Sequence, residues 1–196
     1  MQVENQAEDK LTDRYLVEQV LRGNMRAFNV IVKNTEGLVA QIVFKMIPNY
    51  QDRKDIAQDV YLKAFNNLKG FRFQSKVSTW IAQISYRTCL NFLERKKLLL
   101  VENIEDQEDT SIVINQEAEE FIFKKELRNI LQNAIEQLSP IYKTLITLYH
   151  QEELSYEEIT QITDLPEGTV KSYLFRARRV LKEDLLNQCP VLRKVD

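Results

Sequence analysis

Apolar residues recur at the spacing of an α-helix along most of this chain. The pattern predicts helical structure over residues 14–33, with Gly23-Asn24 as a break between two helices. It also predicts amphipathic helices over residues 52–68 and 79–97, each with apolar side chains on one face. Residues 38–47 are apolar on nearly every side, which predicts a core helix that ends before Pro48. No stretch alternates apolar and polar residues as a strand would. The first half of the chain is therefore expected to be a helical domain.

The second half predicts two further helices, followed by two short helices joined by a tight turn. Helical spacing resumes over residues 119–137, and Ser139 followed by Pro140 predicts the start of another helix. Ser155 and Glu158 then form an S-x-x-E capping box, which satisfies free amide donors at the first turn of a helix. A break follows this helix, and a second short helix begins after the break.

The last of these helices separates apolar from basic side chains. Its apolar positions recur at spacings of four, three and four and so share one face: Val170, Leu174, Ala177 and Leu181. Its basic residues lie off that face: Lys171, Arg176, Arg178, Arg179 and Lys182. This separation is typical of the recognition helix of a helix-turn-helix, which lies in a DNA major groove. The alternative is a solvated basic face on an ordinary helical hairpin.

Charge is unevenly distributed along the 196 residues, whose net charge is −2. Residues 1–100 carry 16 Lys or Arg and 10 Asp or Glu. Residues 101–123 carry 8 acidic residues and no basic one, and residues 124–196 carry 11 of each sign. An acidic strip therefore separates a basic first half from a neutral second half.

The expected fold class is all-α, with two small helical domains joined by an acidic flexible linker. Residues 98–118 are predicted to be the linker because they are rich in acid and lack sustained periodicity. Residues 14–97 would form the first domain, and residues 119–186 the second, which contains the helix-turn-helix.

Composition and the N-terminal sequence exclude several classes of protein. The 2 cysteines, Cys89 and Cys189, are too few and too far apart to predict a disulfide framework or a metal site. They favour a reducing, cytoplasmic location. The polar, acidic N-terminus is not a signal peptide, and no apolar run reaches membrane-spanning length. We therefore expect no direct insertion into a membrane.

Basic and aromatic residues are interleaved in the segment 69–97. It holds seven Lys or Arg against the single acid Glu94, together with five aromatic side chains. This combination suits single-stranded nucleic acid, because cations follow the phosphates while rings stack on unpaired bases, at about 1–3 kcal/mol per base. The alternative is that the rings are core, which is at least as good an explanation for Trp80 and Phe92 but a poorer one for Phe71 and Phe73.

Asp55, Gln58 and Asp59 are spaced to share one helix face. They predict a solvated face or, more specifically, a docking site for a basic partner surface. His150, the only histidine, has no cluster of metal-ligating residues around it in the sequence. No glycine-rich phosphate loop, nucleophile elbow or zinc-protease motif is present. We therefore expect no enzyme, and no catalytic residue, metal or cofactor.

Three blocks of sequence resemble the extracytoplasmic-function (ECF) sigma factors of the sigma-70 family. D-I-A-Q-D-V-Y-L-K-A-F (55–65) is similar to the family's region 2.2, and F-Q-S-K-V-S-T-W-I-A-Q-I (73–84) to region 2.3. Residues 154–181 are similar to region 4.2. The resemblance covers about residues 14–186, and the three blocks occur in the order of the family. It implies a dissociable subunit that brings core RNA polymerase to promoters.

The resemblance also implies roles for particular residues. Those implied to bind the β′ subunit of core polymerase are Asp55, Gln58 and Asp59. Those implied to open and read the single-stranded −10 element are Phe73, Gln74, Ser75, Lys76, Ser78, Thr79, Trp80 and Arg87. Those implied to read the duplex −35 element are Gly168, Thr169, Lys171, Ser172, Tyr173, Phe175, Arg176 and Arg179. The acidic linker would pass through the RNA exit channel of the polymerase, so the β subunit is expected as a partner too.

The resemblance implies one more partner, and two alternative functions stay open. Sigma factors of this type are usually controlled by a separate anti-sigma factor, which is expected here as well. One alternative is a stand-alone helix-turn-helix regulator, which would bind duplex DNA without polymerase, usually as a dimer on paired half-sites. The other is an adaptor protein that uses its helical hairpin to bind protein and has no dependence on nucleic acid.

Overall fold

The protein is described by a computed structural model that covers residues 2–100 and 119–188; side chains are described for residues 12–97 and 128–187. Within the described residues the chain forms helices and turns and no strand, which confirms the all-α prediction. The acidic linker predicted over 98–118 lies outside the described residues, apart from its first three positions, which belong to a helix.

The first half of the chain begins with a helical hairpin. Helix α1 (Gln2–Leu21) starts well before the predicted boundary at Arg14, and α2 (Met25–Met46) follows after a tight turn at Gly23, whose φ of 91° suits glycine. Helix α2 is continuous through Gly37, where the sequence predicted two separate helices. Thr35 and Val39 on either side of this glycine are buried, so packing holds the helix together where local propensity is weak.

Two longer helices complete this half. Asn49 caps α3 (Tyr50–Asn67) by accepting from the amides of Gln51 and Asp52, and a short 3-10 turn, η1 (Leu68–Gly70), follows. Helix α4 (Val77–Leu100) begins two residues earlier than predicted. The reason is distant in sequence: the Asp13 carboxylate accepts a 2.7 Å hydrogen bond from the backbone amide of Val77, 64 residues away. That bond satisfies one of the free donors at the start of the helix.

The described part of the second half contains the four helices predicted, although the last one, with 22 residues, is not the short helix expected. These are α5 (Glu119–Gln137), α6 (Pro140–His150), α7 (Tyr156–Thr163) and α8 (Glu167–Gln188). Ser139 precedes α6 without making a side-chain capping bond. The capping box at the start of α7 is confirmed, since Ser155 and Glu158 exchange hydrogen bonds of 3.0 and 3.2 Å.

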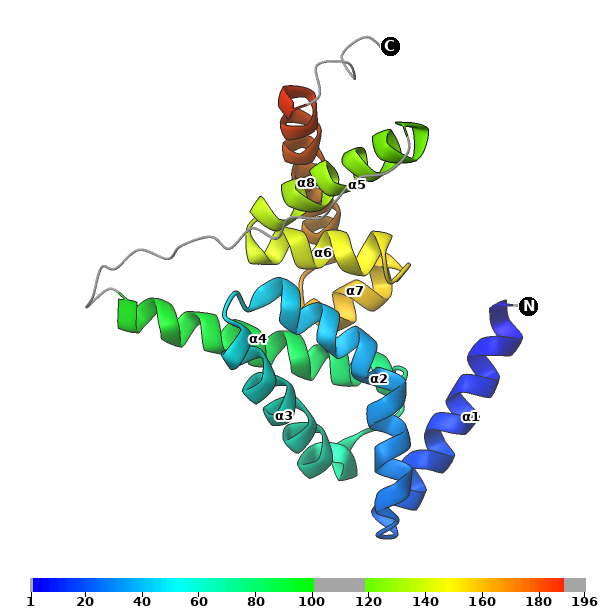
Figure 1. Cartoon of the computed structure of the whole chain (residues 1–196). Helices are drawn as coiled ribbons and strands as arrows, with labels where there is room; N and C mark the ends of the chain where they lie inside the picture. The colour runs from blue at the N-terminus through cyan, green and yellow to red at the C-terminus, as the bar shows by residue number, and fades with distance from the viewer. Residues whose placement is uncertain (1, 101–118, 189–196) are drawn as a thin grey trace.

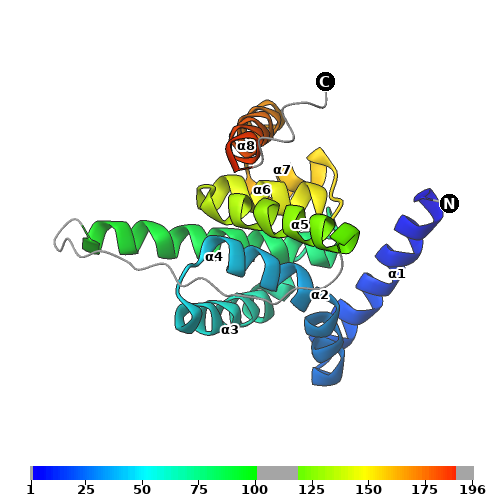
Figure 2. The same ribbon diagram turned by 45° about the horizontal axis from the view of Figure 1, so that its top comes forward.

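The two halves pack against each other. Helix α6 lies on α2, and α7 lies on α4, while α5 and α8 lie farther from the first half (Figures 1 and 2). The five consecutive residues 144–148 of α6 are all buried. Successive residues turn by about 100° around a helix, so burial of five in a row means that every side is covered. One side meets α8 and the other meets α2.

Buried apolar side chains of both halves join into one continuous core. On α4 the buried positions come in neighbouring pairs, such as Ile81 with Ala82 and Ser85 with Tyr86. This wide buried face is needed because α4 packs against α2, α3 and α7. No helix in the described part of the chain is both long and apolar enough to cross a membrane.

Candidate nucleic-acid interface

A cluster of aromatic rings lies at the start of α4. The Phe71 ring is 4.8 Å from that of Phe73 and 5.0 Å from that of Trp80, measured between centroids. Phe71 is buried, whereas Phe73 and Trp80 are half-buried. The Arg14 guanidinium of α1 lies 5.2 Å from the Phe73 ring centre. Phe71 is therefore a core residue, although the sequence favoured an exposed role for it. It packs against the Phe73 and Trp80 rings, which keep part of their faces accessible.

The backbone at Phe73 is unusual. Its φ is 56°, in the left-handed region that residues with a bulky side chain rarely adopt. Such a conformation costs on the order of 1–3 kcal/mol and persists only when the surroundings hold it. Here the contacts of the Phe73 ring with Phe71 and Arg14 hold it. These contacts stabilise the loop in the conformation seen here.

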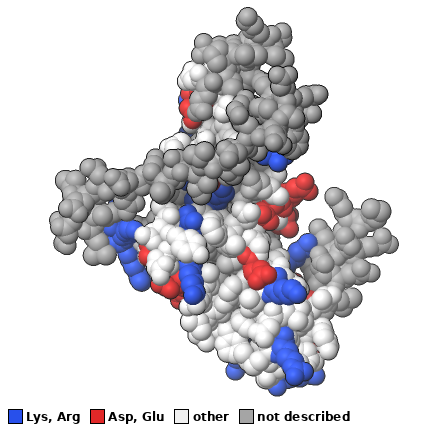
Figure 3. Space-filling view, in the orientation of Figure 1, with Lys and Arg blue, Asp and Glu red and all other residues white. Residues whose placement is uncertain are grey.

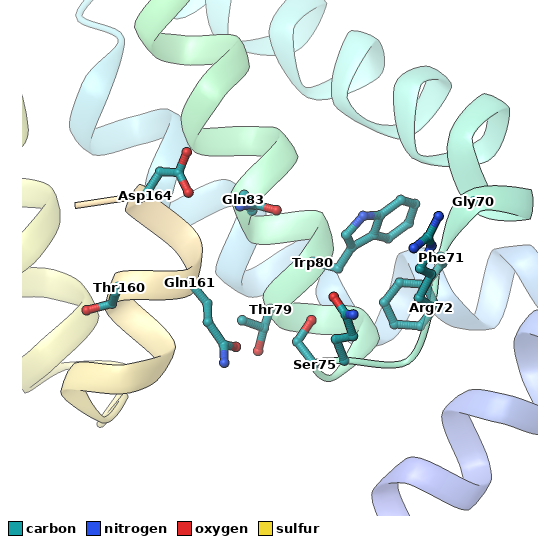
Figure 4. A pocket seen from close by; sticks show the side chains of 11 residues that line it. Gly70, Phe71, Arg72, Ser75, Thr79, Trp80, Gln83, Thr160, Gln161 and Asp164 are labelled. Carbon is teal, nitrogen blue, oxygen red and sulfur yellow. The ribbon is translucent and has the colours of Figure 1, made fainter. Parts of the chain in front are cut away.

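A pocket of about 480 Å³ opens beside this aromatic cluster. Figure 4 shows the Trp80 and Arg72 side chains on one side of it, and Thr160, Gln161 and Asp164 from α7 and the turn after it on the other. The lining on the α4 side consists of loop and helix residues: Gly70, Phe71, Arg72, Gln74, Ser75, Thr79, Trp80 and Gln83. The pocket brings together Gln74, Ser75, Thr79 and Trp80, four of the residues predicted for the −10 element.

The other residues predicted for the −10 element lie on the same part of the molecule. Ser78 is half-buried in the first turn of α4, and Lys76 is half-buried immediately before it. Arg87, two turns farther along α4 than Trp80, is exposed, and its guanidinium makes a 2.7 Å ion pair with Asp164. Thr79 is buried, so only its edge faces the pocket.

The acidic face of α3 lies on another side of the domain. Asp55 and Gln58 are exposed, and Asp59 is half-buried beside Lys63, whose Nζ is 2.7 Å from its carboxylate. Next to them runs an apolar groove of about 680 Å³ between α2 and α3. Gln58 lines this groove, together with Met25, Phe28, Val32, Lys54, Ala57, Tyr61, Leu62 and Phe65. Sequence periodicity could not reveal the groove, because it depends on how two helices meet.

The turn between α7 and α8 depends on a residue in the left-handed conformation. Asp164 ends α7 with a φ of 63°, a position where glycine or asparagine is more common. Its amide donates 2.9 Å to the Thr160 carbonyl, which closes the last turn of the helix. Because its backbone occupies this position, its carboxylate reaches Arg87 of α4.

Helix α8 presents the predicted division of apolar and basic side chains. Val170, Leu174, Ala177 and Leu181 are all buried in the core. The residues predicted to read the −35 element range from half-buried to exposed: Gly168, Thr169, Lys171, Ser172, Tyr173, Phe175, Arg176 and Arg179. Phe175 is 66% exposed, so its ring does not serve as a core side chain.

The basic face of α8 is partly neutralised by acids of the same helix. Lys171 pairs with Glu167 at 2.5 Å, and Arg179 with Glu183 at 3.7 Å, each one turn apart. Glu167 also raises the pKa of Lys171, through its hydrogen bond and its charge. These exposed pairs contribute little to stability.

Arg178 of α8 contacts Tyr149 and His150 of α6. The Arg178 guanidinium lies 5.1 Å from the Tyr149 ring centre, and its Nε donates a 3.3 Å hydrogen bond to Nε2 of His150. Burial and the charge of Arg178 lower the pKa of His150, which favours the neutral imidazole that accepts this bond. His150 is thus a structural partner of Arg178. Among the described residues, no group of three or more His, Cys, Asp or Glu could hold a metal ion.

Two charged residues missed in the sequence join the halves of the molecule. Lys45 of α2 has a side chain only 9% exposed, and its ammonium pairs with the Glu136 carboxylate of α5. Lys143 of α6 also lies 3.3 Å from that carboxylate. Burial raises the pKa of Glu136, but the two ammonium groups outweigh it and hold the pKa below its ordinary value. The signal available was a lysine inside an otherwise apolar segment, which requires a partner.

Basic side chains do not form one continuous patch on the face seen in Figure 3. They lie in separate groups, one of them where α1 meets α2, while acidic side chains gather near the end of α6. Positive charge on this face therefore does not by itself mark where DNA would bind.

Comparison with known proteins identifies the family of the chain. The model of sigma-70 region 2 matches residues 31–98, and that of sigma-70 region 4 matches residues 128–181. The ECF RNA polymerase sigma-E factor of Escherichia coli K12 is 35% identical over 88% of this chain and 94% of its own length. That of Haemophilus influenzae is 33% identical over 90% and 97%. The chain belongs to the ECF sigma factors of the sigma-70 family.

Solved structures show the same fold. CnrH, solved in complex with the cytosolic domain of CnrY, matches with a TM-score of 0.63 at 20% identity, over 91% of this chain and 99% of its own. The sigma factor RpoE of Bartonella quintana, solved with the anti-sigma factor NepR, matches with a TM-score of 0.64 at 18% identity, over 81% and 96%. At this level of identity the likeness supports the fold alone.

Proposed function

We propose that this protein is a dissociable promoter-recognition subunit that binds core RNA polymerase through α3 and reads DNA through α4 and α8. The observation that carries the proposal is the presence, in one chain of this family, of an acidic docking face, a preformed aromatic loop and a basic recognition helix on separate elements. The protein has no catalytic role of its own in this scheme. Because its partners are the polymerase and chromosomal DNA, it acts in the cytoplasm.

The docking site consists of the α2–α3 groove and the acidic residues beside it. The groove is almost purely apolar, and Asp55, Gln58 and Asp59 lie along its acidic side. An amphipathic helix with apolar and basic side chains fits such a surface, since its apolar face enters the groove and its cations meet the carboxylates. The proposed occupant is the coiled coil of the β′ subunit.

The proposed −10 site is the aromatic loop with the first turns of α4. Phe73 and Trp80 offer accessible ring faces to unpaired bases, and the pocket beside them has room for a flipped base. Gln74, Ser75, Lys76, Ser78, Thr79 and Arg87 are the polar groups proposed to complete it. The strained Phe73 backbone supports this site, because a preformed loop loses less conformational freedom when DNA binds.

The proposed −35 site is the exposed face of α8. Thr169, Ser172 and Arg176 are placed to reach base edges, and Lys171 and Arg179 to reach phosphates. Tyr173 and Phe175 would contact thymine methyl groups or sugars. Residues 119–186 thus form the proposed −35 domain, and residues 14–97 form the domain proposed to bind the polymerase and the −10 element. Residues 98–118 are proposed to link the two domains along the β and β′ subunits.

A separate anti-sigma factor is also proposed as a partner. CnrH was solved with the cytosolic domain of CnrY, and RpoE of Bartonella quintana with the anti-sigma factor NepR. The apolar α2–α3 groove would be vulnerable to a competing amphipathic segment, because such a segment needs only the contacts that the polymerase uses.

The experiment that tests the function is binding to purified core RNA polymerase, followed on a native gel. Wild type should comigrate with the core enzyme, and the double variant Asp55→Lys/Asp59→Lys should not. The variant should still fold, because both side chains are on the surface and the Asp59–Lys63 pair contributes only about 0.3–0.5 kcal/mol.

A matched control is Glu18→Lys/Glu94→Lys, which makes the same change in net charge at exposed positions of α1 and α4. It should bind like wild type. Equal binding by the Asp55/Asp59 variant would remove the docking site from α3. Failure of wild type to bind, with specific duplex binding as a dimer, would indicate the stand-alone regulator instead.

A further inference from the structure

The loop proposed to read the −10 element is held by two neighbouring residues of α1. The Asp13 carboxylate accepts a 2.7 Å hydrogen bond from the backbone amide of Val77, where the loop ends and α4 begins. The Arg14 guanidinium lies 5.2 Å from the ring centre of Phe73, in the middle of the loop. Helix α1 therefore contacts the loop at two points, although it is far from the loop in sequence.

These contacts come from a well-packed part of α1. Val17 and Val20 are buried in the core, with 1% and 6% of their surfaces exposed. Asp13 and Arg14 precede Val17 by four and three residues, so both lie on the packed side of the helix. Asp13 is half-buried there, and Arg14 is at the exposed edge. The rest of the fold, rather than the loop itself, therefore determines where these two side chains lie.

Asp13 supplies a group that the start of α4 lacks. The first amides of any helix have no partner within it, and they favour a nearby negative charge. The residue before α4 is Lys76, whose ammonium cannot accept a hydrogen bond, and the first turn of α4 holds no acidic residue. A carboxylate that accepts from an amide makes a stronger bond than a neutral acceptor does. The bond between Asp13 and Val77 therefore stabilises the point at which α4 begins.

Between its anchored ends the loop turns polar residues toward the pocket. Phe71 and Val77 at the two ends are buried, whereas Gln74 and Ser75 between them line the pocket (Figure 4). The left-handed backbone at Phe73, with a φ of 56°, directs this turn, and such a conformation persists only while neighbouring groups hold it. Loss of a contact with α1 would let the backbone relax and change where the polar residues point.

We propose that Asp13 is a positioning residue of the −10 site, which together with Arg14 fixes the shape of the loop and thereby its choice of base. The inference rests on the proposed assignment of this loop and the first turns of α4 to the −10 element. Asp13 acts through the backbone, because the residue that it holds, Val77, is buried. Its loss should relax base selectivity, since selectivity depends on how polar groups meet a base edge. Loss of a phosphate contact would instead weaken binding to every sequence alike.

Four variants of the full chain separate these effects. Asp13→Ala removes the acceptor, whereas Asp13→Asn keeps an oxygen that can accept from the Val77 amide. Glu18→Ala is the matched control, because it removes a carboxylate from the same helix whose side chain is 53% exposed and lies 4.0 Å from Arg22. Arg14→Leu removes the second contact at an exposed position, so it gives the same test if Asp13→Ala does not fold.

The first readout is the fluorescence of Trp80, the only tryptophan of the chain, whose ring lies 5.0 Å from that of Phe71 beside the loop. Without DNA, Asp13→Ala should shift the emission of Trp80 and increase its quenching by acrylamide. Asp13→Asn and Glu18→Ala should match wild type. An unchanged spectrum in Asp13→Ala and Arg14→Leu would show that α1 does not hold the loop, and would overturn the inference.

The second readout is the affinity of each holoenzyme for single-stranded oligonucleotides that carry the −10 sequence of a promoter it transcribes, with each base substituted in turn. Asp13→Ala and Arg14→Leu should lower the ratio of matched to mismatched affinity by about tenfold, which is within the discrimination of one base contact. Asp13→Asn should restore the ratio. A uniform loss of affinity with an unchanged ratio would contradict the positioning role.

The wild-type holoenzyme separates failure of this inference from failure of the proposed function. If it shows no preference for the −10 sequence, the proposed function is wrong and the inference falls with it. If it is selective and Asp13→Ala and Arg14→Leu are equally selective, only the inference is wrong.

Discussion

The face of α3 and the face of α4 illustrate two ways of presenting a binding surface. On α3, Asp55 and Gln58 are exposed, and no residue of the second half lines the neighbouring groove. On α4, Trp80 and Arg87 are approached by α7 and by Asp164. The difference is that the α3 surface is accessible as the structure stands, whereas the α4 surface is already in contact with another part of the chain.

Trp80, on the covered surface of α4, is the residue whose substitution should have the largest effect on promoter opening. Trp80→Ala removes a ring face proposed for an unpaired base, worth about 1–3 kcal/mol, so promoter opening should fall by roughly ten- to a hundredfold. Trp80→Phe keeps a ring and should retain most activity. Permanganate reactivity of unpaired thymines measures the opening. Full opening by the alanine variant, with binding to core enzyme intact, would remove the −10 site from α4.

A loss in the same range, about 1–3 kcal/mol of promoter affinity, is expected for Arg176→Ala on α8, and it should be confined to promoters with an intact −35 element. Arg178→Ala is the matched control, because this neighbouring arginine is engaged with Tyr149 and His150 and should not reach DNA. Footprinting of the holoenzyme measures both. Equal losses in the two variants would mean that α8 lies on DNA in another orientation.

The contact between the two halves should respond to acid through Glu136. Burial raises the pKa of Glu136, but Lys45 and Lys143 outweigh it and hold the pKa below 4.5, its ordinary value, so the stability that this pairing contributes is fully present above that pH and is lost as the pH falls through the lower, folded value. Denaturant melts should therefore show a loss in the free energy of unfolding below about pH 5 that is smaller in Glu136→Gln. An equal loss in the glutamine variant would assign it to other groups.

The smallest effect is expected at Lys63, which pairs with Asp59 on the open face. Lys63→Gln should lower the free energy of unfolding by no more than about 0.5 kcal/mol, because the pair is half exposed. Denaturant melts measure this change. The variant should bind core polymerase at least as well as wild type, since it frees the Asp59 carboxylate. A large loss of polymerase affinity would assign Lys63, rather than Asp59, to the docking site.

The sequence correctly predicted features that depend on residues close together in the chain. The Ser155–Glu158 capping box and the apolar stripe of α8 depend on residues within a few positions of one another, and both are present as expected. The roles of the site residues came from the resemblance to the family, and they stay predictions.

Features that depend on distant partners were not predictable in this way. The start of α4 at Val77 is set by Asp13, and the burial of Lys45 depends on Glu136, 91 residues away. The sequence of α6 did not predict that α2 would cover one side of it, because a helix that is apolar on every side can pack against many partners. The covering of α4 by α7 is of the same kind.

Run-off transcription with purified core polymerase on fragmented genomic DNA tests the proposed function most directly. Addition of this protein should produce discrete transcripts that neither component gives alone, and Arg176→Ala and Trp80→Ala should weaken the same transcripts. Absence of any new transcript, together with specific duplex binding by the protein alone, would contradict its role as a sigma subunit.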